Sequence, residues 1–378
     1  MQSKQKLRID PIIAILILIF GVISIFTVKS ATELVEHTTK YNYALRQGIW
    51  YLVGIIGAII IARIKKEHIY KSIKYLYIIG NVSLILLLLF GTPINNSRCW
   101  FKIPYIGILQ PSEFMKIILI LTLSMLINSF HEKHPIPSLK DEFVLILKTL
   151  IIVGIPSVLT FLQPDTGVVL IYLLITFIML FISGIRYRWF VVVFIVVGLV
   201  LGTILGLYFF NTELFIKIFG TSFFLRVDRL LDWSNKSGYQ LENGMSAIGA
   251  AGLSGFGLNH TPIYFPEPQT DFIFAVYASN FGFIGSVVLI SLIFLFDLRL
   301  ILIALKTKDK MNKYLISGCI AMLIYQQIQN IGMTYGLLPI TGITLPFISY
   351  GGSSLLSYLL MIGIIFNFSR ENKDTFTI

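Results

Sequence analysis

Charged residues are scarce in this sequence of 378 amino acids. Only 13% of the residues are Asp, Glu, Lys or Arg, about half of the fraction that is usual in soluble domains. This scarcity excludes an ordinary soluble globular protein. Hydrophobic residues instead make up 56% of the chain, and the mean hydropathy is +0.82. The composition therefore predicts an all-α polytopic integral membrane protein.

Cysteine is also scarce, and several binding motifs are missing. The chain has 2 cysteines, Cys99 and Cys319, which form neither a disulfide framework nor a metal-ligand spacing. No Gly-x-Gly-x-x-Gly run follows an expected strand, and the sequence contains no basic and aromatic motif for RNA or DNA. These absences argue against a protein metal site, a nucleotide loop and a nucleic-acid partner. Because no repeat or linker divides the chain, we expect a single membrane domain over 1–378.

Ten apolar segments have the length of about 20 residues that a helix needs to cross a bilayer. A polar stretch at about 211–270 separates the seventh segment from the eighth and is expected to be a large loop. The expected spans are about 11–30, 46–63, 73–91, 111–129, 144–162, 166–184, 189–210, 271–296, 313–337 and 347–368.

The basic residues predict the orientation of these spans. Most of the 30 Lys and Arg residues fall on one side of the ten-span arrangement, and cytoplasmic loops are the ones enriched in such residues. We therefore expect both termini in the cytoplasm and the 211–270 loop outside. The formal charge of +11 then reflects topology and attraction to anionic membrane lipids. In this orientation the polar, Pro- and Gly-rich connections gather on the outer side, which is where we expect the chemistry.

The stretch "SRCWFKIPYIGILQPSEFMK" carries charged residues into the start of the fourth span. Pro111 and Glu113 suit the first turn of a helix. Glu113 and Lys116 are three residues apart, so they share a helix face. One interpretation is a helix start with a structural ion pair. The other is that the pair lines a cavity that opens to the outside, because an ionisable residue within a span needs a partner.

Two further motifs have both a structural and a functional interpretation. In "QPDTG", Asp165 lies between the fifth and sixth spans, where it can simply cap a helix. In "LRVDRLLDW", Arg226 and Arg229 are three residues apart on a short amphipathic element expected at the membrane surface. These arginines either neutralise neighbouring acids or clamp a phosphate, for which guanidinium geometry is well suited.

The stretch "YFPEPQTDFIFAVYA" places Asp271 directly before a strongly apolar run. A carboxylate at the threshold of a membrane span is costly unless it is solvated, paired or used. Its structural interpretation is an N-cap for the eighth span. Its functional interpretation is a general base at the outer membrane surface.

Taken together, the motifs resemble those of the SEDS family, the group that contains RodA, FtsW and SpoVE. The resemblance runs from Asp10 to about Phe368 and includes "QPSEFMK", "QPDTG", "GYQ", "PEPQTDFIFAV", "FGFIGS" and "NIGMTYGLLPITGITLPFISYGGSS". The last motif is most similar to RodA. The resemblance implies a ten-span peptidoglycan glycosyltransferase that polymerises lipid II at the outer face of the bacterial cytoplasmic membrane, for cell elongation or division. It also implies a class B penicillin-binding protein as transpeptidase partner, within the wider cell-wall synthesis machinery.

The resemblance assigns roles to particular residues. Asp271 matches the catalytic aspartate, and Glu113 and Lys116 match the paired residues of a central cavity. Further matches for substrate binding or the cavity are Arg98, Trp100, Gln110, Asp165, Arg226, Arg229 and Gln240. No cofactor is implied with certainty, although a divalent cation can accompany the pyrophosphate of the substrate.

The sequence departs from the family pattern at a few positions near these residues. Gln269 replaces a common His, Ser279 and Asn280 replace two acids, and Asn243 replaces a Gln. These departures leave two alternatives open. One is a lipid II flippase, and the other is a weakly active scaffold that recruits a penicillin-binding protein.

Overall fold

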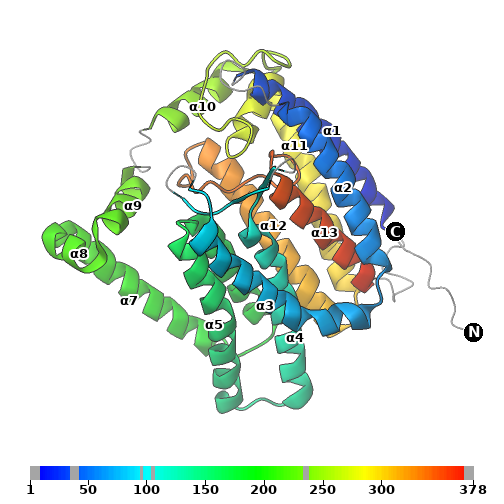
Figure 1. The fold of residues 1–378 in the computed structure, drawn as a ribbon, viewed down its shortest axis with the longest axis vertical. Helices are drawn as coiled ribbons and strands as arrows, with labels where there is room; N and C mark the ends of the chain where they lie inside the picture. The colour runs from blue at the N-terminus through cyan, green and yellow to red at the C-terminus, as the bar shows by residue number, and fades with distance from the viewer. Residues whose placement is uncertain (1–8, 35–41, 94–96, 104–106, 233–237, 370–378) are drawn as a thin grey trace, which may run out of the picture.

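The computed structural model describes residues 9–34, 42–93, 97–103, 107–232 and 238–369. Long α-helices dominate this part of the chain (Figure 1). The helices are α1 (Pro11–Glu33), α2 (Tyr43–Arg63), α3 (Lys66–Phe90), α4 (Pro111–Lys133), α5 (Leu139–Leu162), α6 (Thr166–Ile182), α7 (Arg188–Phe210), α8 (Thr212–Phe219), α9 (Thr221–Asp232), α10 (Tyr239–Ala250), α11 (Ile273–Lys306), α12 (Lys310–Thr334) and α13 (Gly352–Ser369).

Eight of the described helices are long and apolar enough to cross a membrane, namely α1 to α5, α7, α11 and α13. The apolar helix α6 is shorter, with 17 residues. Helix α12 has 25 residues and carries polar side chains such as Gln326 and Asn330, which are buried in the bundle. The prediction of an all-α polytopic membrane protein is confirmed, and the crossing of ten helices stays a prediction.

The helices and the predicted spans differ in their bounds. Helix α11 continues to Lys306, beyond the predicted span end at 296, and α3 begins at Lys66 rather than at 73. The expected 211–270 loop contains α8, α9 and α10. An apolar run marks only the part of a helix that lies in hydrocarbon, so a helix that continues into charged sequence is underestimated.

A small β-hairpin lies between α3 and α4 and was not predicted. Strand β1 (Phe101–Ile103) pairs antiparallel with β2 (Gly107–Leu109), with Phe101 opposite Leu109. Ser353 at the start of α13 donates a hydrogen bond from Oγ to Ile108 O at 3.2 Å. The hairpin is thereby fixed to the end of the bundle that also carries Asp165 and Asp271.

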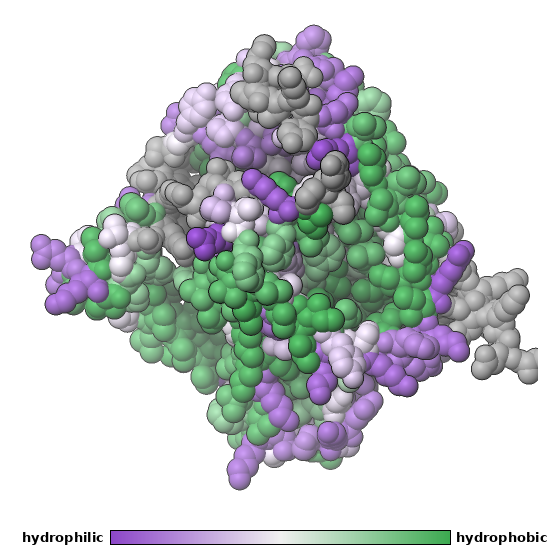
Figure 2. Space-filling model, viewed as in Figure 1, coloured by the Kyte–Doolittle hydropathy of each residue, from purple (hydrophilic) through white to green (hydrophobic). Residues whose placement is uncertain are grey.

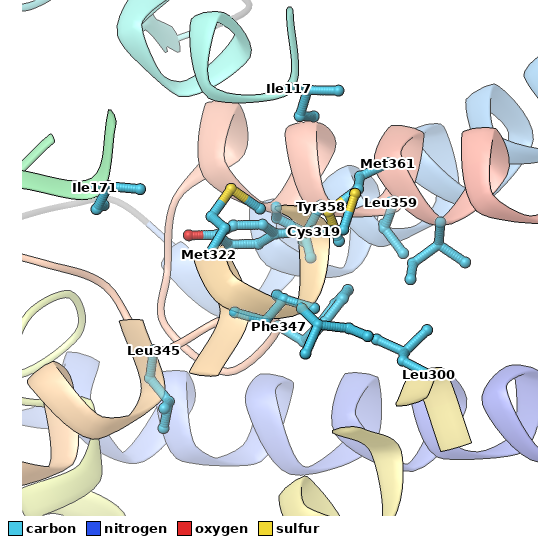
Figure 3. Close-up of a cluster of buried hydrophobic side chains, with 14 of the residues drawn as sticks. Ile117, Ile171, Leu300, Cys319, Met322, Leu345, Phe347, Tyr358, Leu359 and Met361 are labelled. Atoms are coloured by element: carbon cyan, nitrogen blue, oxygen red, sulfur yellow. The ribbon is translucent and has the colours of Figure 1, made fainter. Parts of the chain in front are cut away.

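The centre of the bundle is an apolar core formed by residues from most of the helices (Figure 3). Phe347 lies at its middle, with its ring centroid 6.0 Å from that of Phe20 and 5.3 Å from that of Phe296. The Tyr358 ring lies 5.6 Å away on α13. The turn before α13 therefore reaches into the core and is held by packing on several sides.

Glycines bring α2 and α13 into close contact. A Cβ atom at Gly363 would lie 2.5 Å from Ala58 O, and one at Gly352 would lie 2.4 Å from Trp50 Cε2. Small residues at such positions let membrane helices approach closely, which strengthens van der Waals packing where no hydrophobic effect drives association. Helices α2 and α13 are thus closely packed along one side of the bundle.

Polar side chains of α1 and α2 hold the turn before α13. Gln47 donates from Nε2 to Ser24 Oγ at 2.9 Å and to Ser349 O at 3.0 Å. Ser24 donates from Oγ to Ile348 O at 2.7 Å, and the Tyr51 hydroxyl donates to Phe347 O. Because irregular backbone at membrane depth must find partners within the protein, these side chains satisfy carbonyls that no helix satisfies.

Helix α11 is interrupted at Gly282, where φ is +62°. The preceding glycine-rich segment pairs with the interruption, since Phe283 N donates to Gly252 O at 3.0 Å and Phe256 N donates to Ser279 O at 3.0 Å. A Cβ atom at Gly282 would lie 2.5 Å from Gly255 N. The glycines of this segment therefore serve close backbone contact, as their density in the sequence suggested.

Helix α7 lies apart from the rest of the bundle (Figure 1). Phe190 is its buried residue, and Trp189 donates from Nε1 to Glu142 Oε2 of α5 at 2.8 Å. Most of the other side chains of the helix are exposed and belong to the apolar flanks in Figure 2. At its far end Tyr208 stacks on Phe224 of α9, with ring centroids 5.3 Å apart, and Phe215 of α8 packs beside them. Helices α7 to α9 thus form an arm with its own small aromatic cluster.

Candidate active site

A buried ion pair lies on the first two turns of α4. Pro111 starts the helix and Glu113 lies in its first turn, as the sequence predicted. Lys116 donates a hydrogen bond from Nζ to Glu113 Oε2 at 2.8 Å. The Lys116 side chain is fully buried, and Glu113 is 6% exposed. Each residue needs the other, because an unpaired charge at this depth is strongly destabilising.

Tyr358 of α13 lies against this pair and was missed by the sequence analysis. Its ring centroid is 5.2 Å from Lys116 Nζ, a distance at which a cation and an aromatic face attract. Tyr358 Oη accepts a hydrogen bond from Gln326 Nε2 at 2.7 Å and lies 3.2 Å from Thr344 Oγ1. Tyr358 therefore connects the ion pair to α12 and to the turn before α13.

Asp165 is the N-cap of α6, as its structural interpretation predicted, and it also binds α4. Its Oδ1 accepts from Val168 N at 3.3 Å, and its Oδ2 accepts from Gln110 Nε2 at 2.8 Å and from Ser112 Oγ at 3.2 Å. Burial and the nearby charge of Glu113 raise the pKa of Asp165, and these three hydrogen bonds oppose the rise. Asp165 is thus a buried carboxyl with partners at both oxygens.

Gln110 extends this network to the hairpin side of the site. Trp100 donates from Nε1 to Gln110 Oε1 at 3.1 Å, and the Gln110 backbone N donates to Ser353 Oγ at 2.9 Å. Arg98 is exposed and directs Nη1 toward Leu88 O at 3.4 Å. The structure therefore brings Trp100, Gln110 and Asp165 together but does not place Arg98 in their hydrogen-bond network.

Asp271 lies just before α11 but does not cap it. The N-cap is Phe272, and this helix start has no capping hydrogen bond from a side chain. The interpretation of Asp271 as a helix cap is therefore wrong. The backbone is held instead by Asn330 of α12, which donates from Nδ2 to Asp271 O at 2.8 Å and to Ile343 O at 2.7 Å. The Asp271 carboxyl is left available for another role.

The surroundings of Asp271 disfavour its charged form. Burial is the largest cause that raises the pKa of Asp271 to about 7, followed by the negative charges of Glu267 and Asp165, while a hydrogen bond from Thr270 lowers it. A carboxyl with a pKa near the working pH can accept a proton and release it again. Groups with such perturbed pKa values are enriched in functional sites.

A glycine-containing turn separates Asp271 from the start of α6. A Cβ atom at Gly342, where φ is +70°, would lie 3.5 Å from Asp271 Oδ2. A Cβ atom at Gly167 would lie 2.6 Å from Thr341 O. The segment 341–342 therefore lies between Asp271 and α6. Thr341 Oγ1 is buried and has no hydrogen-bond partner in the described part of the chain. The sequence analysis did not single out this polar group.

Gln240 and Asn243 of α10 hold the segment that leads to Asp271. Gln240 donates from Nε2 to Pro266 O at 3.0 Å, and Asn243 donates from Nδ2 to Tyr264 O at 3.1 Å. Both side chains act on backbone carbonyls a few residues before the carboxylate. Gln240 thus lies near Asp271 as a support for its segment, and Asn243, although it departs from the family pattern, keeps a role there.

The other departures fall into two groups. Gln269 lies beside the site, where it donates from Nε2 to Glu267 Oε2 at 3.3 Å. Ser279 and Asn280 are buried away from solvent, and Asn280 donates from Nδ2 to Ser30 Oγ of α1 at 2.8 Å. Neutral residues at these two positions suit their enclosed setting, so these departures concern packing of α11 on α1.

Arg226 and Arg229 lie on α9, in the amphipathic helix that the sequence predicted. Their side chains fall outside the described residues, so a phosphate clamp there stays a prediction. Within the described ranges, no three His, Cys, Asp or Glu side chains gather as a metal site would require. Cys99 and Cys319 are free and buried.

The arrangement combines a carboxyl that titrates near neutrality with a rigid polar cluster beside it. Asp271 can accept a proton from a hydroxyl group that approaches its oxygens. Asp165 joins α6 to the start of α4 through Gln110 and Ser112, and its negative charge is one of the causes that raise the pKa of Asp271. A pKa raised to about 7 suits a carboxyl to proton transfer near neutral pH.

Comparisons with known proteins agree with these features. The family model that describes the cell cycle proteins FtsW, RodA and SpoVE matches residues 7–374. A probable peptidoglycan glycosyltransferase FtsW from Coxiella burnetii is 33% identical over 346 residues, which cover 88% of each protein.

Two solved structures have the same fold over nearly their full length. One is described as the structural coordination of polymerization and crosslinking by a peptidoglycan synthase complex, with a TM-score of 0.77 and 27% identity, covering 95% of this chain and 97% of that one. The other is the rod shape determining protein RodA of Thermus thermophilus, with a TM-score of 0.67 and 26% identity over 96% of each chain. The motif-based prediction is confirmed, and the chain belongs to the FtsW, RodA and SpoVE family of cell cycle proteins.

Proposed function

We propose that this protein is a peptidoglycan glycosyltransferase that polymerises lipid II, with Asp271 as general base. The observation that carries the proposal is the state of Asp271, which caps no helix and whose pKa is raised to about 7. The names of its relatives support the reaction, since proteins of similar sequence and length are described as probable peptidoglycan glycosyltransferases.

The chemistry follows from the position of this carboxyl. The 4-hydroxyl oxygen of one sugar attacks the anomeric carbon of another, and the bond from that carbon to the pyrophosphate breaks. Asp271 takes the hydroxyl proton, which is worth typically about 10²–10⁴-fold in rate. Undecaprenyl pyrophosphate leaves with the electron pair. Both lipid tails remain in the bilayer, so the acid must lie where a tethered head group can reach it.

Cations are needed where negative charge develops on the leaving pyrophosphate. Lys116 is fully buried and paired with Glu113, so we assign it to the scaffold of the site. The exposed Arg98 and Lys102, together with Arg226 and Arg229, are the residues we propose for the pyrophosphate. A divalent cation could share this task with them.

The proposal includes a membrane orientation and a partner. We place both termini in the cytoplasm, ten helices across the bilayer and the site at the outer face. A reporter fused after Lys308 should then be cytoplasmic, and one after Asn235, outside the described residues, should be external. The partner we propose is a class B penicillin-binding protein, because a structure of similar fold comes from a complex that couples polymerization to crosslinking.

The direct test is polymerisation of purified lipid II by the purified protein, with and without such a partner. We expect long glycan strands from the wild type and none from Asp271→Ala, while Glu132→Ala, which removes an exposed acid, should leave product formation unchanged. Absence of glycan from the wild type with its partner would overturn the proposal. In that case lipid II transport across proteoliposomes would distinguish a flippase from a scaffold.

A further inference from the structure

An apolar cavity lies between α1, α2 and α13, at the end of the bundle where α1 begins and α2 ends. Its volume is about 180 Å³, larger than the engineered cavity of about 150 Å³ that binds benzene or xenon. Every residue that lines it is apolar, and the lining includes Ala14, Ile17, Ala58, Ala62, Leu359 and Phe366.

The cavity exists because small residues meet where three helices converge. Ala14 of α1 and Ala58 and Ala62 of α2 leave space that larger side chains would fill. Leu18 and Ile9 also line the cavity and are 60% and 40% exposed. The space is therefore reachable from the lipid-facing side of the bundle, and a flexible hydrocarbon chain could enter it.

Basic residues gather at the mouth of this cavity. Arg63 lies one helical turn beyond Ile59, a lining residue, and is exposed. Lys65 follows and is exposed, and Lys66 places Nζ 5.6 Å from the ring centroid of Phe368. Residues 63–67 thus contain three basic residues and one acidic residue, Glu67.

The acid on the α1 side of the mouth is neutralised. Asp10 is fully buried and accepts two hydrogen bonds from Arg299, at 2.9 Å from Nε and 2.7 Å from Nη2. Both of these bonds go to Oδ2, and Oδ1 accepts from Ile13 N at 3.0 Å. An ion pair with charge-assisted hydrogen bonds of this kind leaves little charge to oppose an approaching anion. The mouth is therefore positive, and the cavity behind it is apolar.

We propose that this cavity binds an acyl chain of an anionic phospholipid, with the headgroup phosphate against Arg63 and Lys65. An apolar cavity with basic residues at its mouth favours an anionic lipid over a neutral one, because the basic residues attract the negative headgroup. The chain's own first eight residues fit less well, since Lys4, Lys6 and Arg8 would bring positive charge to a positive rim. The bound acyl chain would fill the space between α1, α2 and α13 and so contact all three helices. Side chains of α1 and α2 hold the turn of residues 347–349, which leads into α13.

The test measures lipid retention by the full-length protein, purified in detergent with phosphatidylglycerol or phosphatidylcholine of identical acyl chains. Native mass spectrometry gives the number of lipids retained per chain. We expect the wild type to retain one phosphatidylglycerol in preference to phosphatidylcholine. Ala58→Trp, which fills the cavity, should lower that retention at least tenfold. Arg63→Gln combined with Lys65→Gln should abolish the preference between the two lipids.

Matched variants separate this site from general lipid contact. Val288→Trp places the same bulk on the half-exposed surface of α11, and Lys133→Gln with Lys140→Gln removes two exposed cations elsewhere. Both should behave as the wild type. If Ala58→Trp does not purify as a folded monodisperse protein, Leu18→Trp replaces it. Equal retention of both lipids by the wild type, or undiminished retention in the cavity-filled variant, would overturn the proposal.

Discussion

Asp165 and Asp271 both lie just before a membrane helix, but the structure treats them differently. Asp165 caps α6 and accepts hydrogen bonds from Val168 N, Gln110 and Ser112. Asp271 does not cap α11, and its pKa of about 7 reflects burial and the neighbouring acids Glu267 and Asp165. The Asp165 carboxyl accepts hydrogen bonds that hold α4 and α6 together, whereas the Asp271 carboxyl does not cap the helix that follows it.

This difference separates two kinds of polar residue at one site. A carboxyl that accepts hydrogen bonds at both oxygens fixes its surroundings, and those bonds favour its charged form. A carboxyl whose backbone is fixed by Asn330, but whose oxygens remain poorly stabilised as anions, is poised to take one. Local helix-start patterns do not distinguish the two, because each residue is an acid at an expected helix start. Only the resemblance to the SEDS motifs gave Asp271 a different role from Asp165.

The largest expected effect tests Asp271. Asp271→Asn keeps the shape of the side chain but cannot accept the proton, so glycan formed per folded protein should fall by about 10²–10⁴-fold. Thermal unfolding in detergent should change little, since no cap is lost. A variant with near-normal polymerisation would show that Asp271 is not the base and would remove the contrast with Asp165.

The next effect concerns the buried ion pair. Lys116→Ala leaves Glu113 unpaired at a depth where the loss of one partner costs about 3–5 kcal/mol. We expect lower thermal stability and lower yield of folded protein for Lys116→Ala and for Glu113→Ala. A variant in which the two charges are exchanged should recover part of the stability. Unchanged unfolding temperatures in both single variants would show that the ion pair does not contribute to the stability of the fold.

A smaller effect is expected for Asp165→Asn. The hydrogen bonds to a charged acceptor are weakened, which costs about 1.5–3 kcal/mol in stability. Activity per folded molecule should fall no more than about tenfold. The measurement compares unfolding temperature and glycan yield in the same preparation. A loss of activity as large as that of Asp271→Asn, without a loss of stability, would mean that the two acids share the chemistry.

The smallest effect is a shift of the pH profile. Asp271 must be ionised to accept a proton, so kcat/KM should rise with pH through a pKa of about 7. Glu267→Gln removes a negative neighbour that raises this pKa, so the rising limb should move to lower pH. Glu213→Gln, which removes an exposed acid on α8, serves as the control. A limb that stays in place would show that Glu267 does not act on the base.

The apolar runs and short motifs predicted much of this molecule. The all-α membrane fold, the helix start at Pro111 and the N-cap role of Asp165 follow from local chemistry that adjacent residues specify. The contact between Glu113 and Lys116 was predictable for the same reason, since one helix turn fixes it.

Contacts between distant segments could not be predicted in this way. Tyr358 lies over Lys116 and Asn330 holds Asp271, yet nothing local in α13 or α12 marks these side chains apart from neighbouring polar residues. The β1–β2 hairpin was missed because three-residue strands carry almost no periodic signal. The kink at Gly282 depends on an earlier partner segment, residues 252–257, as the bond from Phe283 N to Gly252 O shows.

The attachment of Gln47 to Ser349 has a consequence for how the protein is made. The two residues are separated by 302 positions, so at about 5–20 residues per second the ribosome needs roughly 15–60 s to supply the partner carbonyl after Gln47 has emerged. During this interval the Gln47 amide can donate to Ser24 Oγ of α1, but its second bond, to Ser349 O, cannot yet form. The hydrogen bonds of α1 and α2 to the turn of residues 347–349 are therefore among the last contacts that synthesis makes possible.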